Sequence, residues 1–123
     1  MGSISVSIDV PKLEKGIEFY TRAFGFKFSF SPVPGVAILE AGDSSLCLLE
    51  KKSGSKPSPK TKDLRRYRRH WTPVHLDIHV KKLKPALKKA VAAGAKVELL
   101  FENEEHGSAA FCSDLFGHGF CLI

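Results

Sequence analysis

The sequence consists of two similar halves, so any fold it adopts must be built from two copies of one unit. A shift of 70 residues places segment 5–10 on segment 75–80, and segment 46–49 aligns with segment 120–123 at the ends of the two halves. The shift makes Ile8 and Ile78, Val10 and Val80, Lys12 and Lys82, and Leu13 and Leu83 identical pairs, and one deletion adds Gly25 with Gly94 and Lys27 with Lys96. In the segments at the ends of the halves, Cys47 matches Cys121. Because the pairs keep the same order in both halves, the sequence predicts an internal duplication.

Hydrophobic periodicity predicts the same order of elements in each half. Apolar and polar residues alternate at the start of each half, as in a half-buried strand, and apolar residues then recur every three or four positions, as in a helix. The first half is expected to contain a strand at 4–10, a helix between Pro11 and Gly25, and strands near 26–31, 35–41 and 44–50. The second half is expected to contain a strand at 74–80, a helix from Leu83 to Gly94, and strands near 95–101, 107–113 and 118–123. The pattern predicts an α+β fold of two tandem βαβββ modules.

A basic segment separates the halves. Between Lys51 and His70 there are nine lysines or arginines and one acidic residue, Asp63, although the net charge of the whole chain is only +6. The stretch 53–59 consists only of Ser, Gly, Lys and Pro, which is typical of a linker. We therefore expect a single domain over residues 1–123, with one module at 3–50, a linker at 51–72 and a second module at 73–123.

Composition excludes several classes of protein. With 43% hydrophobic and 26% charged residues, the chain of 123 residues is typical of a globular protein. No apolar run approaches the roughly 20 residues of a membrane helix, and the N-terminus has no signal-peptide pattern. We expect a cytoplasmic protein without a membrane partner. Its three cysteines are an odd number, which argues against a disulfide framework and favours buried thiols.

A stripe of ionisable residues occupies the strand predicted at 74–80. His75, Asp77 and His79 alternate along it, so their side chains share one face at intervals of about 6.6 Å. A carboxylate beside a histidine can hold the imidazole in one tautomer, as in an acid–base pair. The three are therefore candidate catalytic residues. Alternatively, they form a solvated strand face, like the serine-containing face of the first strand.

The run from Arg65 to Trp71 combines four arginines with three aromatic rings. Basic residues interleaved with aromatic ones bind nucleic acid through phosphate contacts and stacking, and they also attract small anions. A third interpretation is a solvated connector that docks only through Tyr67 and Trp71, and we expect residues 68–71 to be held against the domain. Two further histidines, His106 and His118, lie near predicted turns and are expected at the surface.

Two segments resemble a known family. The segment Val10–Phe26, with Phe19-Tyr20 followed by Phe24-Gly25-Phe26, resembles the first strand–helix unit of the vicinal oxygen chelate superfamily. The segment Asp114–Phe120 resembles the approach to its last strand. That superfamily includes glyoxalase I, bleomycin-resistance proteins and extradiol dioxygenases. The resemblance extends over nearly all of the chain outside the linker, and it implies one glyoxalase-like domain with a cavity between curved sheets.

The resemblance also implies a site formed by the first and last strands of each half. In metal-dependent members these strands supply four ligands, and the four positions fall here on Ser5, Cys47, His75 and Cys121. Only His75 is a usual ligand, because those members bind their metals through His, Gln and Glu. We therefore expect no cofactor and no usual metal chemistry, with zinc bound by His75, Cys47 and Cys121 as the alternative. The expected ligand contacts are Ser5, Ser7, Cys47, Trp71, His75 and Cys121.

Together these observations predict a protein that binds or converts a small molecule, with an anion as the ligand that the basic run favours. The alternative is a metal-dependent glyoxalase-like lyase or isomerase with an altered ligand set, or an enzyme related to the dioxygenases. A third hypothesis, which we favour less, is a nucleic-acid accessory protein that binds through the basic linker. Open sheet edges in each module predict pairing of modules and a homodimer.

Overall fold

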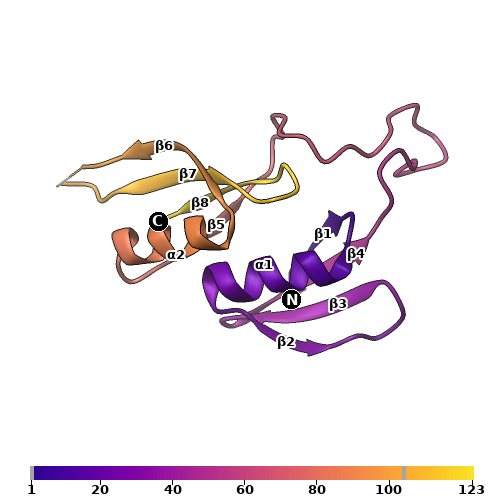
Figure 1. Ribbon diagram of the computed structural model, residues 1–123, viewed down its shortest axis with the longest axis horizontal. Helices are drawn as coiled ribbons and strands as arrows, with labels where there is room; N and C mark the ends of the chain where they lie inside the picture. The colour runs from indigo at the N-terminus through magenta and orange to yellow at the C-terminus, as the bar shows by residue number, and fades with distance from the viewer. Residues whose placement is uncertain (1, 104) are drawn as a thin grey trace. The chain divides into compact units, whose positions relative to one another are not determined.

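The computed structural model describes residues 2–103 and 105–123, and these residues divide into two units (Figure 1). Unit 1 contains the residues up to Thr21 together with Gly25–Tyr67, and unit 2 contains Arg22–Phe24 together with Arg68–Ile123. Each unit is organised around one four-stranded sheet. The division falls inside the basic segment, so the first part of that segment belongs to unit 1 and its last residues belong to unit 2.

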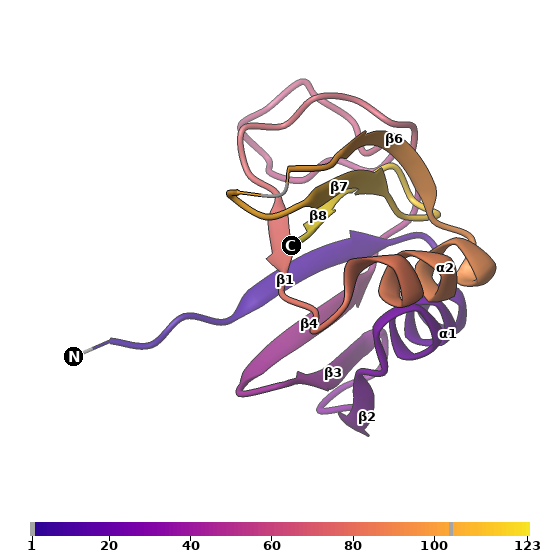
Figure 2. The same ribbon diagram turned by 90° about the vertical axis from the view of Figure 1, so that its left-hand side faces the viewer.

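The sheet of unit 1 has the strand order β1-β4-β3-β2. Its elements in chain order are β1 (Val6–Val10), α1 (Leu13–Phe24), β2 (Lys27–Phe30), β3 (Val36–Ala41) and β4 (Ser44–Glu50). β1 and β4 are parallel and the other neighbours are antiparallel. The crossover from β1 to the edge strand β2 passes through α1, so a helix lies along this sheet (Figures 1 and 2).

Helix α1 packs closely on its sheet. A Cβ atom added at Gly16 would lie 3.1 Å from a methyl group of Val10 and 3.2 Å from one of Leu48, so the small residue allows the helix to approach β1 and β4. The N-cap residue, Lys12, makes no side-chain cap. Instead, the backbone N–H of Leu13 donates a 2.8 Å hydrogen bond to the carboxylate of Glu50. The last residue of β4 therefore satisfies one of the unpaired donors at the start of α1.

Unit 2 repeats this arrangement with the strand order β5-β8-β7-β6. Its elements are β5 (Leu76–Ile78), α2 (Leu83–Ala93), β6 (Lys96–Phe101), β7 (Ala109–Ser113) and β8 (Gly119–Leu122). Helix α2 contacts β7 and β8. Every second side chain of these two strands points into the core. The core residues are Ala110, Cys112, Phe120 and Leu122. One face of the second sheet is thus buried, and the other holds the residues of the candidate site.

The internal duplication predicted from the sequence is confirmed. Gly25 and Gly94 end the two helices in the same left-handed conformation, with φ angles of +73° and +118°. Cys47 and Cys121 lie at matching positions of β4 and β8, and the first strand of each sheet begins one residue after Ser5 or His75. The α+β class and the two βαβββ modules are therefore as the periodicity indicated.

Most of the predicted strands are longer than those in the structure, and the difference is largest for β5. β1 begins at Val6 and leaves Ile4 outside the sheet with 90% of its surface exposed, and Val74 likewise precedes β5. β5 has only three residues because its register with β8 spans Leu76 to Ile78. His79 lies just beyond β5 for the same reason. The predicted strands are too long because the alternation of apolar and polar residues extends beyond the residues that pair with a neighbouring strand.

Neither helix in the described ranges, 2–103 and 105–123, has the length and apolar character needed to cross a bilayer. The expectation of one domain that spans both modules stays a prediction. The linker expected at 51–72 is divided between them after Tyr67.

Candidate functional site

The open face of the second sheet presents a row of four side chains, one from each strand. Asp77 of β5 pairs with Cys121 of β8, Cys121 with Phe111 of β7, and Phe111 with Leu99 of β6. Directly paired residues point to the same face of a sheet, so this row runs from a carboxylate through a thiol to two apolar groups. It places polar and apolar contacts for a ligand next to each other.

Three of the expected site residues meet at the polar end of this row. One ligating atom each from His75, Asp77 and Cys121 lies within 4.8 Å of the other two. The Nε2 atom of His75 is 3.1 Å from Oδ1 of Asp77, and both side chains are 50% exposed. Cys121 is buried beneath them. The cluster is thus open to solvent on the side of the imidazole and carboxylate and closed on the side of the thiol.

The thiol of this cluster is held in its neutral form. Burial raises the pKa of Cys121, and Asp77 raises it further through its charge and through a hydrogen bond that it accepts from the thiol. The neighbouring Cys112 faces the core, where burial raises its pKa to about 11. The sequence-based expectation of buried thiols is therefore confirmed for these two cysteines, which are both free.

Unit 1 contains the equivalent row, with different chemistry. Ser7 pairs with Cys47, Cys47 with Ile38, and Ile38 with Phe30. Ser5 precedes this row and is exposed. The residue paired with Cys47 on β1 is a serine, whereas the residue paired with Cys121 on β5 is Asp77. The contacts expected of Ser5, Ser7 and Cys47 with a ligand stay predictions.

The remaining candidates lie outside the cluster. His79 is exposed beyond the end of β5 and is absent from the group formed by His75, Asp77 and Cys121. His106 is exposed, as expected, whereas His118 is partly buried beside the ring of Phe116, with ring centroids 6.5 Å apart. The structure places Cys121 beside Asp77, and this proximity supports Asp77 as a candidate residue. Spacing in the sequence could not have shown it.

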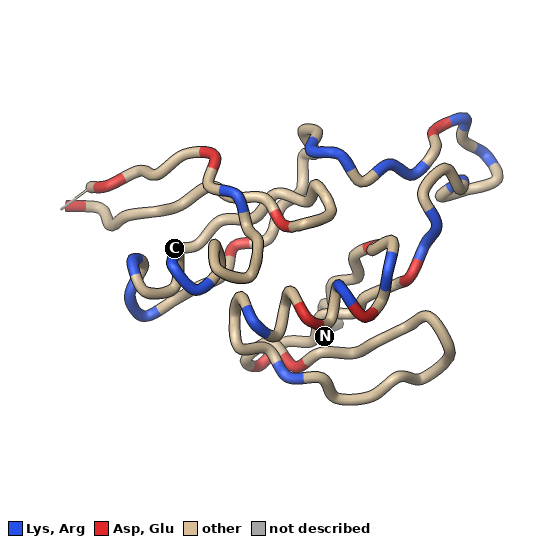
Figure 3. Tube along the Cα trace, viewed as in Figure 1, with Lys and Arg blue, Asp and Glu red and all other residues tan. Residues whose placement is uncertain are grey.

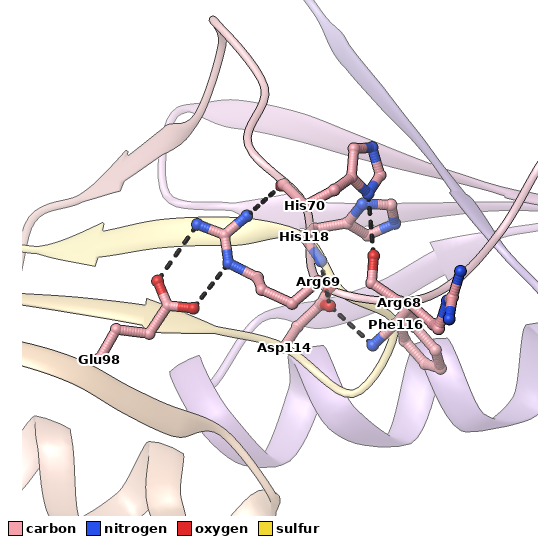
Figure 4. Close-up of polar contacts among 7 residues, drawn as sticks. All are labelled: Arg68, Arg69, His70, Glu98, Asp114, Phe116 and His118. Carbon is pink, nitrogen blue, oxygen red and sulfur yellow. Dashed lines mark hydrogen bonds and ion pairs between the residues drawn. The ribbon is translucent and has the colours of Figure 1, made fainter.

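Sequence reasoning missed an arginine clamp on the open face of unit 2. The guanidinium of Arg69 donates two hydrogen bonds to the Glu98 carboxylate, Nε to Oε2 at 2.7 Å and Nη2 to Oε1 at 3.1 Å (Figure 4). This pairing raises the pKa of Arg69. A Cβ atom at Gly119 would lie 2.7 Å from Nη2 of Arg69, so the guanidinium lies directly over Gly119. Since Gly119 and Cys121 point to the same face of β8, the clamp stands next to the cluster.

The residues around Arg69 are tied to the turn between β7 and β8. The carbonyl of Arg68 contacts Nδ1 of His70 at 2.8 Å, and a Cβ atom at Gly117 would lie 2.6 Å from the backbone of Arg68 (Figure 4). Within that turn, the buried carboxylate of Asp114 accepts hydrogen bonds from the backbone N–H groups of Phe116 and His118. Residues 68–70 therefore dock on unit 2, as the sequence predicted for the end of the linker.

Trp71 does not follow this docking. Its side chain is 81% exposed, so the expectation that it is held against the domain is wrong. The physical reason is that the anchoring contacts are polar and end at His70, whose carbonyl accepts a hydrogen bond from Nη1 of Arg69. A contact between Trp71 and a ligand stays a prediction.

The first part of the basic segment folds back on unit 1. Arg65 donates a 2.8 Å hydrogen bond from Nε to Oδ2 of Asp9, and its backbone exchanges hydrogen bonds with Gly54 and Ser55. The hydroxyl of Tyr67 donates to the carbonyl of Lys51 at 2.6 Å, and burial, followed by the nearby charge of Asp9, raises its pKa. Two of the four arginines in the run are thus paired with carboxylates, which reduces the charge available for an anion.

Comparison with known proteins assigns this architecture. The model of the glyoxalase-like domain matches residues 5–123. The chain belongs to this family, and with it to the vicinal oxygen chelate superfamily. The resemblance inferred from the helix and turn segments is therefore confirmed. No curated protein sequence matches the chain.

Solved structures share the fold at low sequence identity. The hypothetical protein SA1046 from S. aureus is 22% identical, covers 99% of this chain and 96% of its own, and has a TM-score of 0.71. FosX, a fosfomycin resistance protein from Listeria monocytogenes, is 16% identical, covers 99% and 91%, and has a TM-score of 0.75. TioX from Micromonospora sp. ML1 is 16% identical, covers 98% and 97%, and has a TM-score of 0.71. A mutant of the Listeria FosX was solved with Mn(II) and 1S,2S-dihydroxypropylphosphonic acid.

Proposed function

We propose that this glyoxalase-like protein binds or converts a small molecule on the open face of the second sheet. The observation that supports this function is the gathering of His75, Asp77 and Cys121 within 4.8 Å at the end of a row that continues into exposed apolar side chains. Small-molecule sites combine apolar walls with a few convergent polar groups, and this face offers both. The membership in a family of glyoxalase-like proteins supports the same conclusion.

Proton transfer is the chemistry that the cluster supplies without any added group. If Nε2–H of His75 donates to Asp77, the Nδ1 atom is left as a proton acceptor on the exposed side of the ring. Asp77 then fixes the tautomer and stabilises the imidazolium once a proton has been accepted. Cys121 keeps Asp77 in place through its thiol hydrogen bond.

The test is ligand binding followed at the cluster. We expect hits from a small-molecule thermal-shift screen to move the backbone amide signals of Asp77 and Cys121 in the NMR spectrum of the ¹⁵N-labelled protein. His75→Gln should weaken such hits at least about fivefold, whereas the matched change His106→Gln, at an exposed histidine outside the cluster, should not. Hits that leave the amides of β5 and β8 unchanged would contradict this location of the site.

A second candidate function is supported by the donor atoms of the same cluster. An imidazole, a carboxylate and a thiol suit tetrahedral zinc with a fourth position open, but the thiol makes the set a poor one for manganese. His75, Asp77 and Cys121 would hold the ion, and zinc would supply a Lewis acid to the bound ligand. Its binding has to displace the proton that the environment of Cys121 retains, so affinity should rise with pH.

Metal analysis separates the two candidates. We expect no stoichiometric nickel or manganese in protein purified without chelators or an affinity-tag metal, and no conversion of the methylglyoxal–glutathione adduct above background. One equivalent of zinc that is lost in Cys121→Ser and kept in Cys112→Ser would support the zinc site. Isomerase activity restored by nickel would instead favour a metal-dependent glyoxalase-like enzyme. The homodimer, the cytoplasmic location and the zinc ligand Cys47 stay predictions from the sequence.

A further inference from the structure

We propose that the small molecule is an amphipathic organic cation, an amine or amidine attached to an apolar or aromatic body. This rests on the function proposed above and names the class of ligand. The cationic group would lie against Asp77, and the body would lie over the apolar side chains that continue the row from Cys121.

The strands that form this face carry three charged residues, Asp77 on β5 and Lys96 and Glu98 on β6. From Val97 to Ile123 the sequence has five acidic residues and no lysine or arginine. The lysines of unit 2 are instead in or next to α2 and at the start of β6 (Figure 3). Helix α2 contacts β7 and β8 on the side of the buried residues Phe120 and Leu122, so its lysines are on the side of the sheet opposite the open face.

Lys96 is the exception, because it pairs with Ser113, which pairs with Gly119, and so it lies on the open face at the β6 edge. Asp77 lies at the opposite edge, on β5, so the β5 end of the open face favours cations over anions.

Asp77 is a carboxylate without a permanent positive partner. Within residues 2–103 and 105–123, its ion pairs and hydrogen bonds involve only His75 and the thiol of Cys121. No lysine or arginine of that part of the chain forms an ion pair with it. A half-exposed carboxylate beside apolar surface is a strong site for a charge-assisted hydrogen bond from an ammonium or amidinium group.

The body of the ligand is recognised by a platform of three side chains, Leu99, Phe101 and Phe111. Phe111 pairs with both Cys121 and Leu99, and Phe101 lies two residues after Leu99 on the same strand, so all three face the same side as the cluster. They are 58%, 50% and 41% exposed, respectively. An aromatic ring close to a carboxylate can also attract the cation through its own π face.

The arginine on this face does not reverse the preference. Arg69 stands over Gly119, two residues before Cys121, but its guanidinium forms two hydrogen bonds with the carboxylate of Glu98. This pair adds no net charge to the face. It lies beside the row, over Gly119, and leaves Asp77 as the carboxylate available to a ligand.

Three probes that share one body and differ in charge test this class. They are 2-(2-naphthyl)ethylammonium, 2-(2-naphthyl)ethanol and 2-naphthylacetate, titrated into the full ¹⁵N-labelled chain in the presence of EDTA so that no metal occupies the cluster. We expect the ammonium compound to bind with a Kd of about a millimolar, the range expected for ligands of this size, and at least about fivefold more tightly than the other two. Its affinity, unlike that of the alcohol, should fall as salt is raised from low to physiological concentration.

Matched variants locate the preference. Asp77→Asn should remove the advantage of the ammonium compound and leave the affinity for the alcohol unchanged. Asp43→Asn makes the same change at an exposed turn of unit 1 and should have no effect. Phe111→Leu should weaken all three probes, because it removes part of the platform and not the charge.

The possible results separate the class of ligand from the site itself. Tighter binding of the acetate, or an ammonium affinity that Asp77→Asn does not change, would overturn the cation preference while the site on this face stands. If none of the three probes moves the amides of β5, β7 and β8, both the cation preference and the location of the site are contradicted. Selective binding of the ammonium compound that depends on Asp77 supports both.

Discussion

Replacement of Gly119 by alanine tests whether the docked end of the basic segment depends on the clamp over β8. The new Cβ atom would lie 2.7 Å from Nη2, 3.0 Å from Cζ and 3.2 Å from Nη1 of Arg69, all closer than an ordinary contact of 3.4–4 Å. Gly119 does not have a positive φ angle, so the backbone itself accepts alanine. The guanidinium is the part that has to move, and movement breaks its two hydrogen bonds with Glu98.

The size of the effect follows from two opposing contributions. The side chains of Arg69 and Glu98 are 39% and 36% exposed, so loss of their ion pair costs at most about 1 kcal/mol. Alanine is favoured over glycine inside a strand by roughly 0.5–1 kcal/mol. We therefore expect Gly119→Ala to change the free energy of unfolding little in the natural chain and to increase it by about 0.5–1 kcal/mol in the Arg69→Ala background.

A double-mutant cycle by urea unfolding measures this difference directly. The coupling energy between Gly119→Ala and Arg69→Ala should be about 1 kcal/mol, as is usual for residues in contact. The matched cycle uses Arg66→Ala, since Arg66 is an exposed arginine of the same run, and should give a coupling near zero. Equal effects of Gly119→Ala in the natural and Arg69→Ala backgrounds would refute the clamp.

Four further experiments test other contacts. Folding raises the pKa of Cys112 from 9.0 to about 11, so its buried neutral thiol stabilises the fold below pH 9 and this contribution is lost as pH rises toward 11. The free energy of unfolding, measured by urea titration, should therefore fall more steeply with pH in the natural chain than in Cys112→Ala. Parallel curves for the two would contradict this prediction. Iodoacetamide at pH 8 should label Cys47 before the other two thiols, as read by mass spectrometry. Glu50→Ala should destabilise the chain by about 1 kcal/mol through loss of the α1 cap, measured against the exposed control Glu40→Ala, and an equal effect of both would argue against the cap. Arg65→Ala should speed tryptic cleavage in the basic segment by releasing it from Asp9, and an unchanged rate would mean that this ion pair does not hold it.

The sequence predicted the fold closely because the duplication and the hydrophobic periods are local properties of the chain. Both helices and all eight strands follow from spacing and from the glycines that end the helices. The errors occur at Ile4, Val74 and Trp71, where the residue type is apolar but no partner strand or pocket is present. Burial there depends on neighbours that periodicity does not specify.

The candidate site was only half predictable. His75 and Asp77 share a strand, so their common face could be read from alternation. The proximity of Cys121 to Asp77 depends on the register between β5 and β8, which lie more than 40 positions apart in the sequence, and the position of Arg69 over Gly119 depends on how the linker ends. Register and docking are tertiary properties, and a single sequence gives no direct signal for either.

The two equivalent rows across the sheets show that the two halves of a duplicated fold can carry different side chains at the same positions. Ser7 and Asp77 occupy the same position in the two units, and so do Ile38 and Phe111. Each row is supported by its own strands, so a substitution in one leaves the strand pairing of the other intact. The second row has a carboxylate where the first has a neutral serine, and an aromatic ring where the first has an isoleucine. One chain thus carries two copies of the same row, one ionisable and one neutral, and each can be altered without disturbing the strand pairing of the other.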